Sequence, residues 1–216
     1  MNEATVEQVL HQVPAFLKKI HGWVHDGGSS HGDAGERARL RRARHGPEAY
    51  AFEATAQLFP AGRDDGIDED GQRLIGCLAI LLAQVRGEVG EKVFDETDDA
   101  RESRVVNGAQ AARKLGEMAG QDKETGSSPR LARLRFGRMM RAFDADDRLR
   151  AFRDLLALLG IERQSVFDRR RLAEIFLRWH QPRIQFAFAR GYFASLNREQ
   201  STPDADEMQP NPATTV

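Results

Sequence analysis

The stretch PRLARLRFGRMMRAFDADDRLRAFRDLLALLGIERQSVFDRRRLAEIFLRWHQPRIQFAFARGY (residues 129–192) decides the fold, because it reads as one amphipathic helix after another. The first helix is expected over residues 131–143, where apolar side chains recur at the i, i+3, i+4, i+7 spacing of one helix face. The apolar faces of the four expected helices are Phe136, Met139, Met140 and Phe143; Leu149, Phe152, Leu156 and Leu159; Leu172, Ile175, Phe176 and Trp179; and Ile184, Ala187, Phe188, Gly191 and Tyr192. Four such helices in succession can close a bundle.

Start and stop signals separate these helices. Asp144 or Asp146 is expected to cap the second helix, and Gly160 to end it. The third helix is expected to begin near residues 165–168, and Pro182 suits the first turn of the fourth. Within the first helix, Leu134 falls among the arginines, so its first turn is expected to pack differently from the rest.

The same stretch is strongly basic. It holds fifteen arginines, no lysine and seven carboxylates, so its net charge is +8, while the whole chain carries −1 and the remainder therefore −9. A chain that segregates charge in this way has a basic half that is a candidate for binding a polyanion. Arginine outnumbers lysine 27 to 5, which suits phosphate recognition by the planar guanidinium fork. A GC-rich genome produces the same ratio, so the placement of the arginines is the better argument.

A second arginine cluster lies in the N-terminal half. A first helix is expected over residues 5–24, capped by Thr5 and kinked or divided at Pro14. After a glycine-rich loop, Asp33 and Glu36 are spaced as a capping box for a helix that carries Arg37, Arg39, Arg41, Arg42 and Arg44. These arginines fit either a solvated helix face paired with Glu36 or, as a group, contact with a polyanion.

Other features of the sequence set the protein class. The longest apolar run, residues 74–85, is far shorter than the ~20 residues that a membrane-spanning helix needs, so it is expected to form a buried core helix. The single cysteine, Cys77, excludes a disulfide framework and fits a reducing, cytoplasmic location. We also expect no signal peptide.

The predicted fold is all-α, with two small helical bundles packed together. The expected parts are an N-terminal helical bundle over residues 1–119, a linker over 120–130, a basic C-terminal bundle over 131–197, and a disordered tail over 198–216. An acidic segment, residues 87–103, is expected to be a surface excursion of the first bundle.

Three segments in this order resemble one family. RFGRMMRAFDADDRLRAFRDLLALL (residues 135–159) followed by FDRRRLAEIFLRWHQPRIQFAFARGYF (167–193) resembles the C-terminal half of CasB, the small subunit of the type I-E CRISPR surveillance complex, Cascade. GDAGERARLRRA (32–43) is similar to the family's Leu-Arg-Arg segment, and NGAQAARKLGEM (107–118) to its Ala-rich segment. The matches cover roughly half the chain.

The resemblance implies a non-catalytic subunit in antiviral defence. It would hold the DNA opened by guide RNA, above all the displaced strand of the R-loop, and brace neighbouring subunits. Its expected partners are the backbone and large Cascade subunits, a second copy of itself, guide RNA and target DNA. Base pairing to the guide supplies the sequence specificity in such complexes.

The candidate nucleic-acid-binding residues follow from the same resemblance. Arg41 and Arg42 match the family's Arg-Arg pair, while Arg135, Arg141 and Arg153 match arginines of its basic helices. Arg183 lies where the family tends to be basic, and Arg138 is a basic neighbour without a firm counterpart.

The sequence carries no sign of catalysis. It has no phosphate-binding loop and no HExxH or CxxC motif, so no catalytic residue, cofactor or metal is expected. Two other interpretations stay open: a helical protein-interaction scaffold whose arginines pair with acidic subunits, and a free-standing, sequence-indifferent DNA-binding protein.

Overall fold

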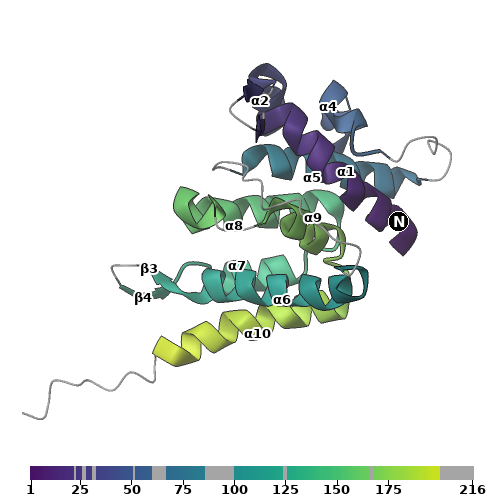
Figure 1. The fold of residues 1–216 in the computed structure, drawn as a ribbon. Helices are drawn as coiled ribbons and strands as arrows, with labels where there is room; N and C mark the ends of the chain where they lie inside the picture. The colour runs from purple at the N-terminus through teal and green to yellow at the C-terminus, as the bar shows by residue number, and fades with distance from the viewer. Residues whose placement is uncertain are drawn as a thin grey trace, which may run out of the picture.

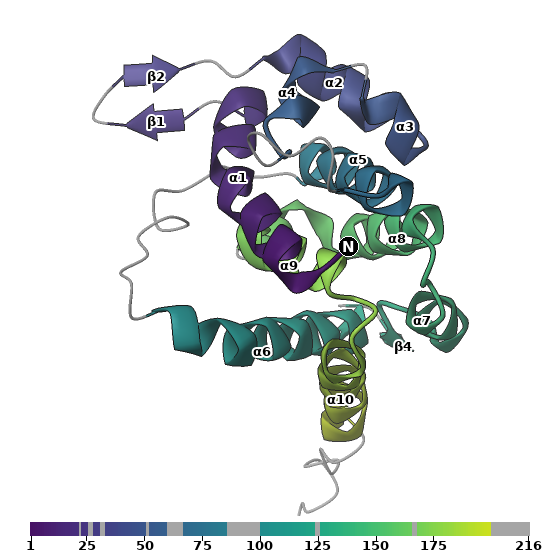
Figure 2. The same ribbon diagram turned by 90° about the vertical axis from the view of Figure 1, so that its right-hand side faces the viewer.

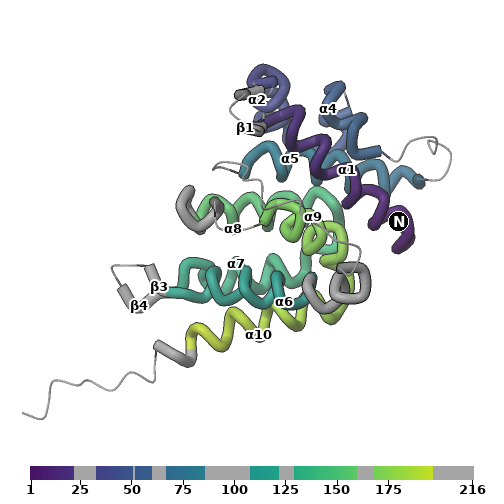
Figure 3. Tube along the Cα trace, viewed as in Figure 1, coloured from purple at the N-terminus to yellow at the C-terminus, as the bar shows by residue number. Residues whose placement is uncertain are grey.

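Helices stacked in layers make up most of the residues that the structure describes (Figure 1). The computed structural model describes residues 1–21, 23–25, 28–30, 33–50, 52–59, 67–85, 100–123, 126–165 and 168–199, and Figure 3 follows the same chain as a tube. The predicted tail from residue 200 onward and most of the acidic 87–103 segment lie outside these ranges.

The prediction of an all-α fold is confirmed. The helices of the described residues are α1 (Glu3–His21), α2 (Ala34–Arg42), α3 (Gly46–Ala49), α4 (Glu53–Ala56), α5 (Glu69–Gln84), α6 (Ala100–Gly120), α7 (Arg133–Met140), α8 (Ala145–Ser165), α9 (Arg169–Leu177) and α10 (Pro182–Glu199). Two short antiparallel hairpins complete them: β1 (Trp23–His25) with β2 (Gly28–Ser30), and β3 (Asp122–Lys123) with β4 (Gly126–Pro129). No helix within the described ranges is long and apolar enough to cross a membrane.

Several helix boundaries differ from the predicted ones. Asn2, not Thr5, caps α1: its side-chain oxygen accepts a hydrogen bond from the Thr5 amide at 2.8 Å. The same helix continues through Pro14, so it is not divided there. The prediction that Gly160 ends the second basic helix was also wrong, since α8 runs on to Ser165. A glycine lowers helix propensity by only about 1 kcal/mol, which neighbouring interactions can offset.

Two predicted caps are present. Asp33 accepts from the Glu36 amide at 2.8 Å and begins α2, and Asp144 accepts from the Asp146 amide at 2.9 Å and begins α8. The capping-box role of Glu36 was wrong, because its buried carboxylate accepts instead from the amide of Ala54, at the start of α4, at 2.6 Å. This contact ties α4 to α2 and removes Glu36 as an ion-pair partner for the α2 arginines.

Helix α5 forms the centre of the N-terminal half. From Ile75 to Ala83 its apolar side chains are all buried, as the sequence predicts. Its buried residues join those of α8, α9 and α10 in one hydrophobic cluster. The predicted division of the chain into two bundles at residues 120–130 stays a prediction. Helix α6 precedes that segment and α10 follows it, and the two helices lie alongside each other (Figure 1).

Helices α6 and α10 approach each other at glycines. A Cβ atom added at Gly116 would overlap the carbonyl oxygen of Phe188, and one added at Gly191 would overlap that of Arg113. The two backbones are therefore in direct contact, which only residues without a side chain permit. This close approach fixes the position of α10. It therefore also fixes Tyr192 and Phe193, the aromatic residues of α10 that contact Phe136 of α7.

A buried carboxylate links the N-terminal half to α8. Asp146 is 7% exposed, and its carboxylate accepts from Arg73 Nε at 2.8 Å and from the Gly46 amide at 3.4 Å. The thiol of Cys77 also donates to it, at 3.4 Å. The first turn of α8 is thus bound to both α3 and α5.

We predict that alanine at Gly116 or Gly191 destabilises the fold. The added methyl group has no room against the backbone of the facing helix, and overpacking of this kind costs about 1–3 kcal/mol. Urea unfolding followed by circular dichroism measures the loss. The matched control is Gly137→Ala in α7, where the nearest atom to the new Cβ is 3.8 Å away and higher helix propensity should raise stability by up to about 1 kcal/mol. Equal effects at the three positions would contradict this account of the α6–α10 contact.

Acid should weaken the Asp146 link. Burial disfavours the charged carboxylate, but hydrogen bonds from Arg73, Cys77 and Gly46 outweigh burial and hold its pKa below the ordinary value. A lowered pKa stabilises the folded state above the unfolded value of about 3.9, and this contribution is lost as the pH falls through the folded pKa. Asp146→Asn should therefore be less stable than the parent at pH 7, with the difference shrinking below about pH 4. A stability difference that does not change with pH would refute the ionic role of Asp146.

Candidate nucleic-acid interface

Side chains from α10 and from the turn after α9 hold the backbone of α7 and of the residues just before it in place. The Tyr192 hydroxyl donates to the Leu131 carbonyl at 2.7 Å, and the Trp179 indole N–H donates to the Met139 carbonyl at 3.0 Å. Phe136 stacks on Tyr192 with ring centroids 4.3 Å apart. Since Phe136 and Met139 face inward on the predicted side, the arginines of α7 must face outward.

The α7 arginines are accordingly exposed. Arg135, Arg138 and Arg141 all lie at the surface, as does Arg133 on the same helix. Within the described residues, Arg135 and Arg138 make no ion pair, and the Nε of Arg141 donates to the Gly137 carbonyl at 3.1 Å. Leu134 is 66% exposed among them, which bears out the expectation that the first turn packs differently.

A groove of about 400 Å³ runs between α7 and α8. Its lining residues are Arg138, Arg141, Ala142, Asp147, Arg150, Ala151 and Asp154. Arg150 did not appear among the sequence candidates, although it lies on the same basic helix as Arg153. It pairs with Asp147 at 2.9 Å, and both residues are exposed. The groove therefore brings three guanidinium groups from two helices together with two carboxylates.

Arg153 connects this groove to the N-terminal arginine cluster. It is half-buried, one helical turn beyond Arg150, and its Nη1 donates to the carbonyl of Ala43 at 3.4 Å. Ala43 lies between Arg42 and Arg44, both of which are exposed. This contact joins α8 to the end of α2, 110 residues earlier in the sequence, and Figure 2 shows α2, α5, α8 and α7 in this order down the molecule.

Two of the candidate arginines, Arg41 and Arg183, do not line this groove. Arg41 is half-buried at the end of α2, and its carbonyl accepts from Gln84 at 3.5 Å. Arg183 is exposed, but it lines a second groove of about 200 Å³ beside Glu3, Glu174 and Arg178. The structure therefore gathers Arg138 and Arg141 at one groove, connects Arg153 and Arg42 to it, and places Arg183 at another.

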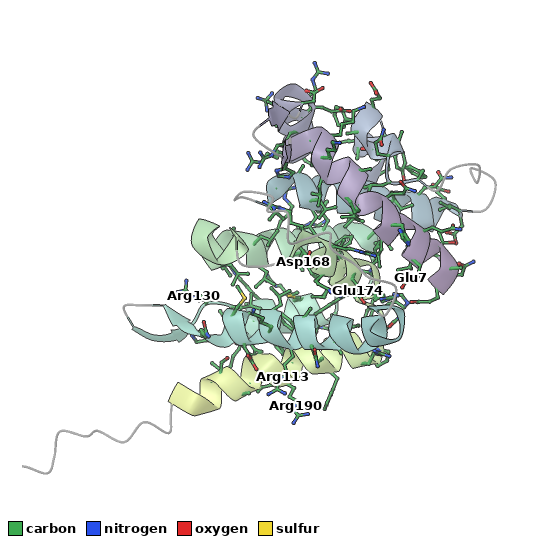
Figure 4. All side chains as sticks on the ribbon, viewed as in Figure 1. Glu7, Arg113, Arg130, Asp168, Glu174 and Arg190 are labelled. Carbon is green, nitrogen blue, oxygen red and sulfur yellow. The ribbon has the colours of Figure 1, made fainter. Side chains whose placement is uncertain are left out.

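Other arginines of the basic stretch are structural. Arg148 is 3% exposed and donates to the carbonyls of Phe143, Phe176 and Leu177 at 3.0, 2.9 and 3.3 Å. Burial lowers its pKa to about 10, so it stays charged at neutral pH. Arg178 is equally buried and is bound by the carboxylates of Glu3 and Glu7 from α1 and Glu174 from α9; Figure 4 labels Glu7 and Glu174.

Among the described residues, two kinds of reactive site are absent, a metal cluster and an activated thiol. They contain no group of three or more His, Cys, Asp or Glu side chains placed to hold a metal ion. Burial, with Asp146 nearby, raises the pKa of the Cys77 thiol well above its usual range, which disfavours the nucleophilic thiolate. Burial also lowers the pKa of His21 to about 3, and its Nε2 lies 3.2 Å from the Leu82 carbonyl.

Comparison with known proteins identifies one family. The sequence matches the family described as CRISPR-associated protein Cse2 over residues 36–193. The match covers more than half of the chain and includes both arginine clusters and the α7–α8 groove. No curated protein and no solved structure matches the chain.

Two single substitutions test which arginines stabilise the fold and which are exposed without an ion pair. Arg148→Met should destabilise the protein by about 3 kcal/mol, because it leaves three carbonyls without their buried donor. Arg138→Met removes the same charge from an exposed position and should change stability by less than about 0.5 kcal/mol. Thermal unfolding of both variants measures the contrast. Similar stability of the two variants would mean that Arg148 is not the structural member of this pair.

Proposed function

The chain belongs to the CRISPR-associated Cse2 (CasB) family, the small subunit of the type I-E Cascade complex, and we propose that it holds DNA there through the sugar-phosphate backbone. The family is generally non-catalytic, which agrees with a binding role. The proposed interface is the α7–α8 groove with its flanking arginines, extended across Arg153 to Arg42 and Arg44. Arg41 and Arg183 are proposed as peripheral contacts.

The observation that carries the proposal is the contact between Arg153 and Ala43. Arg153 lies one helical turn from Arg150 of the groove and reaches the chain between the exposed Arg42 and Arg44, which supports a shared surface over separate patches. Nucleic acid presents a regular array of phosphates, and neutralising several of them releases counterions. A row of guanidinium groups on three helices matches that array.

Contacts of this kind position a strand but do not read its bases. This limitation suits a subunit of a complex in which guide RNA reads the sequence by base pairing. Asp147 and Asp154 lie among the arginines of the groove, and their charge lowers the attraction for phosphate. We therefore propose weak binding by the isolated chain, strengthened when the other subunits hold the same DNA.

The proposed assembly follows the family. The chain is proposed to contact the backbone and large subunits of Cascade and a second copy of itself, and to stabilise the R-loop by retaining the displaced strand. Guide RNA is proposed to be reached mainly through its phosphates.

The test compares DNA binding by the parent and by Arg138→Ala/Arg141→Ala. The parent should bind single- and double-stranded DNA without sequence preference, and added salt should weaken binding steeply. Removing two phosphate contacts should weaken binding at low salt about tenfold and reduce the slope of log affinity against log salt by about 2. Fluorescence anisotropy with labelled oligonucleotides measures both quantities.

The matched control is Arg113→Ala/Lys114→Ala, which removes two exposed charges from α6; Figure 4 shows Arg113 at the far side of the bundle from α2. With double-stranded DNA as the probe, it should leave affinity within about twofold of the parent, because neither residue lines the α7–α8 groove. Absence of DNA binding by the parent at low salt would favour the protein-interaction scaffold. Sequence-selective binding by the parent would contradict the proposed recognition of the sugar-phosphate backbone.

A further inference from the structure

The outer face of α10 carries exposed aromatic side chains on both sides of an arginine. Phe186 is 69% exposed and Phe193 is 48% exposed. Arg190 between them is exposed and makes no ion pair with any residue that the structure describes. Spacings of four and three residues place all three on one face of the helix. Figure 4 shows Arg190 on the outer side of α10, away from the other helices.

This face continues onto the start of α7. The ring of Phe193 meets the edge of Phe136 at a centroid distance of 5.2 Å. Arg133 is exposed on α7 and lies close enough to Tyr192 to act on the pKa of its hydroxyl, which burial raises. The stripe Phe186–Arg190–Phe193 therefore adjoins the basic surface that we propose for DNA.

The charge of this surface favours one kind of occupant. Neither residues 129–143, which include α7, nor residues 182–196 of α10 contain a single carboxylate. A second copy of the chain docked symmetrically on this face would set Arg190 against Arg190, and neither of these two stretches supplies an acidic residue to compensate; like charges placed together oppose association. A polyanion is attracted by the same arrangement.

The exposed phenylalanine rings favour single-stranded over double-stranded nucleic acid. In a duplex the bases are stacked on one another and cannot lie against a protein ring, whereas a single strand presents free base faces. Stacking on aromatic side chains next to basic groups is how proteins hold single strands without reading the sequence. At a rise of about 1.5 Å per residue, the two phenylalanines are about 10 Å apart along the helix, which leaves room for Arg190 to meet the phosphates between two bases.

We propose that the Phe186–Arg190–Phe193 stripe is a base-stacking surface that makes the chain prefer single-stranded over double-stranded nucleic acid. This inference rests on the proposed function, since it assigns the unpaired strand to α10 and leaves the α7–α8 groove as a phosphate site for either form. The preference comes from the rings, and Arg190 contributes charge that both forms share.

The test measures affinity for two probes, a thirty-nucleotide oligothymidine and a thirty-base-pair duplex, using the full chain. Phe186→Ala/Phe193→Ala should weaken binding of the oligothymidine at least tenfold, because loss of one stacked base costs about 1–3 kcal/mol, and change duplex binding less than twofold. Both side chains are exposed, so the fold should be kept. The matched control is Phe143→Ala, a phenylalanine 58% exposed and outside the stripe, which should change neither affinity.

A second readout detects stacking directly. Phe193→Trp should bind the oligothymidine as the parent does, and its added indole fluorescence should be quenched by the single strand and not by the duplex. The parent, titrated alongside, provides the signal of Trp23 and Trp179 to subtract.

Each result separates this inference from the proposed function. If the parent binds both probes and the double phenylalanine variant binds both equally well, the stacking surface is refuted and phosphate binding stands. An equal loss for both probes would also refute it, because stacking acts on unpaired bases alone. Normal DNA binding together with failure to enter the assembled complex would identify the stripe as a protein interface and overturn the inference. A parent that binds neither probe would overturn the proposed function as well.

Discussion

Buried guanidinium groups hold the basic half of the molecule together. Arg148 donates to carbonyls at the ends of two helical segments, Phe143 after α7 and Phe176 and Leu177 at the end of α9. A helix end leaves its last carbonyls without partners, and burying them unsatisfied is costly. One charged side chain on α8 supplies the missing donors for both segments. Arg148 thereby ties the segment that follows α7 to both α8 and the end of α9.

A second constraint is close backbone contact. Gly116 and Gly191 let α6 and α10 meet without intervening side chains, and the aromatic residues of α10 then reach α7. Asp146 in turn binds α8 to α3 and α5 through Arg73, Cys77 and Gly46. Support for the proposed interface therefore comes from every part of the described chain, and a substitution far from any arginine can move it.

The arrangement of charge explains why one residue type has two roles. Arginines that face helix ends or carboxylates, such as Arg148 and Arg178, are buried and bonded to carbonyls or carboxylates within the protein. Those on the outer faces of α7 and α8 are exposed, and they are the ones that we propose to contact phosphates, with the carboxylates among them lowering the attraction. Such a surface suits a subunit of a larger complex, where several proteins share one strand and none has to hold it alone.

The sequence by itself determined the helical class, the apolar face of nearly every basic helix, the caps at Asp33 and Asp144, and the family, because these depend on local spacing and residue order. Which arginines are free was decided only by the tertiary structure. Arg138 and Arg148 stand in neighbouring, equally basic helices, yet one is exposed and the other is 3% exposed. Glu36 accepts a hydrogen bond from the Ala54 amide instead of capping α2, and Arg153 donates to the carbonyl of Ala43, 110 residues earlier in the sequence. Burial and pairing depend on what a distant segment brings to the same place, and helical periodicity carries no information about that.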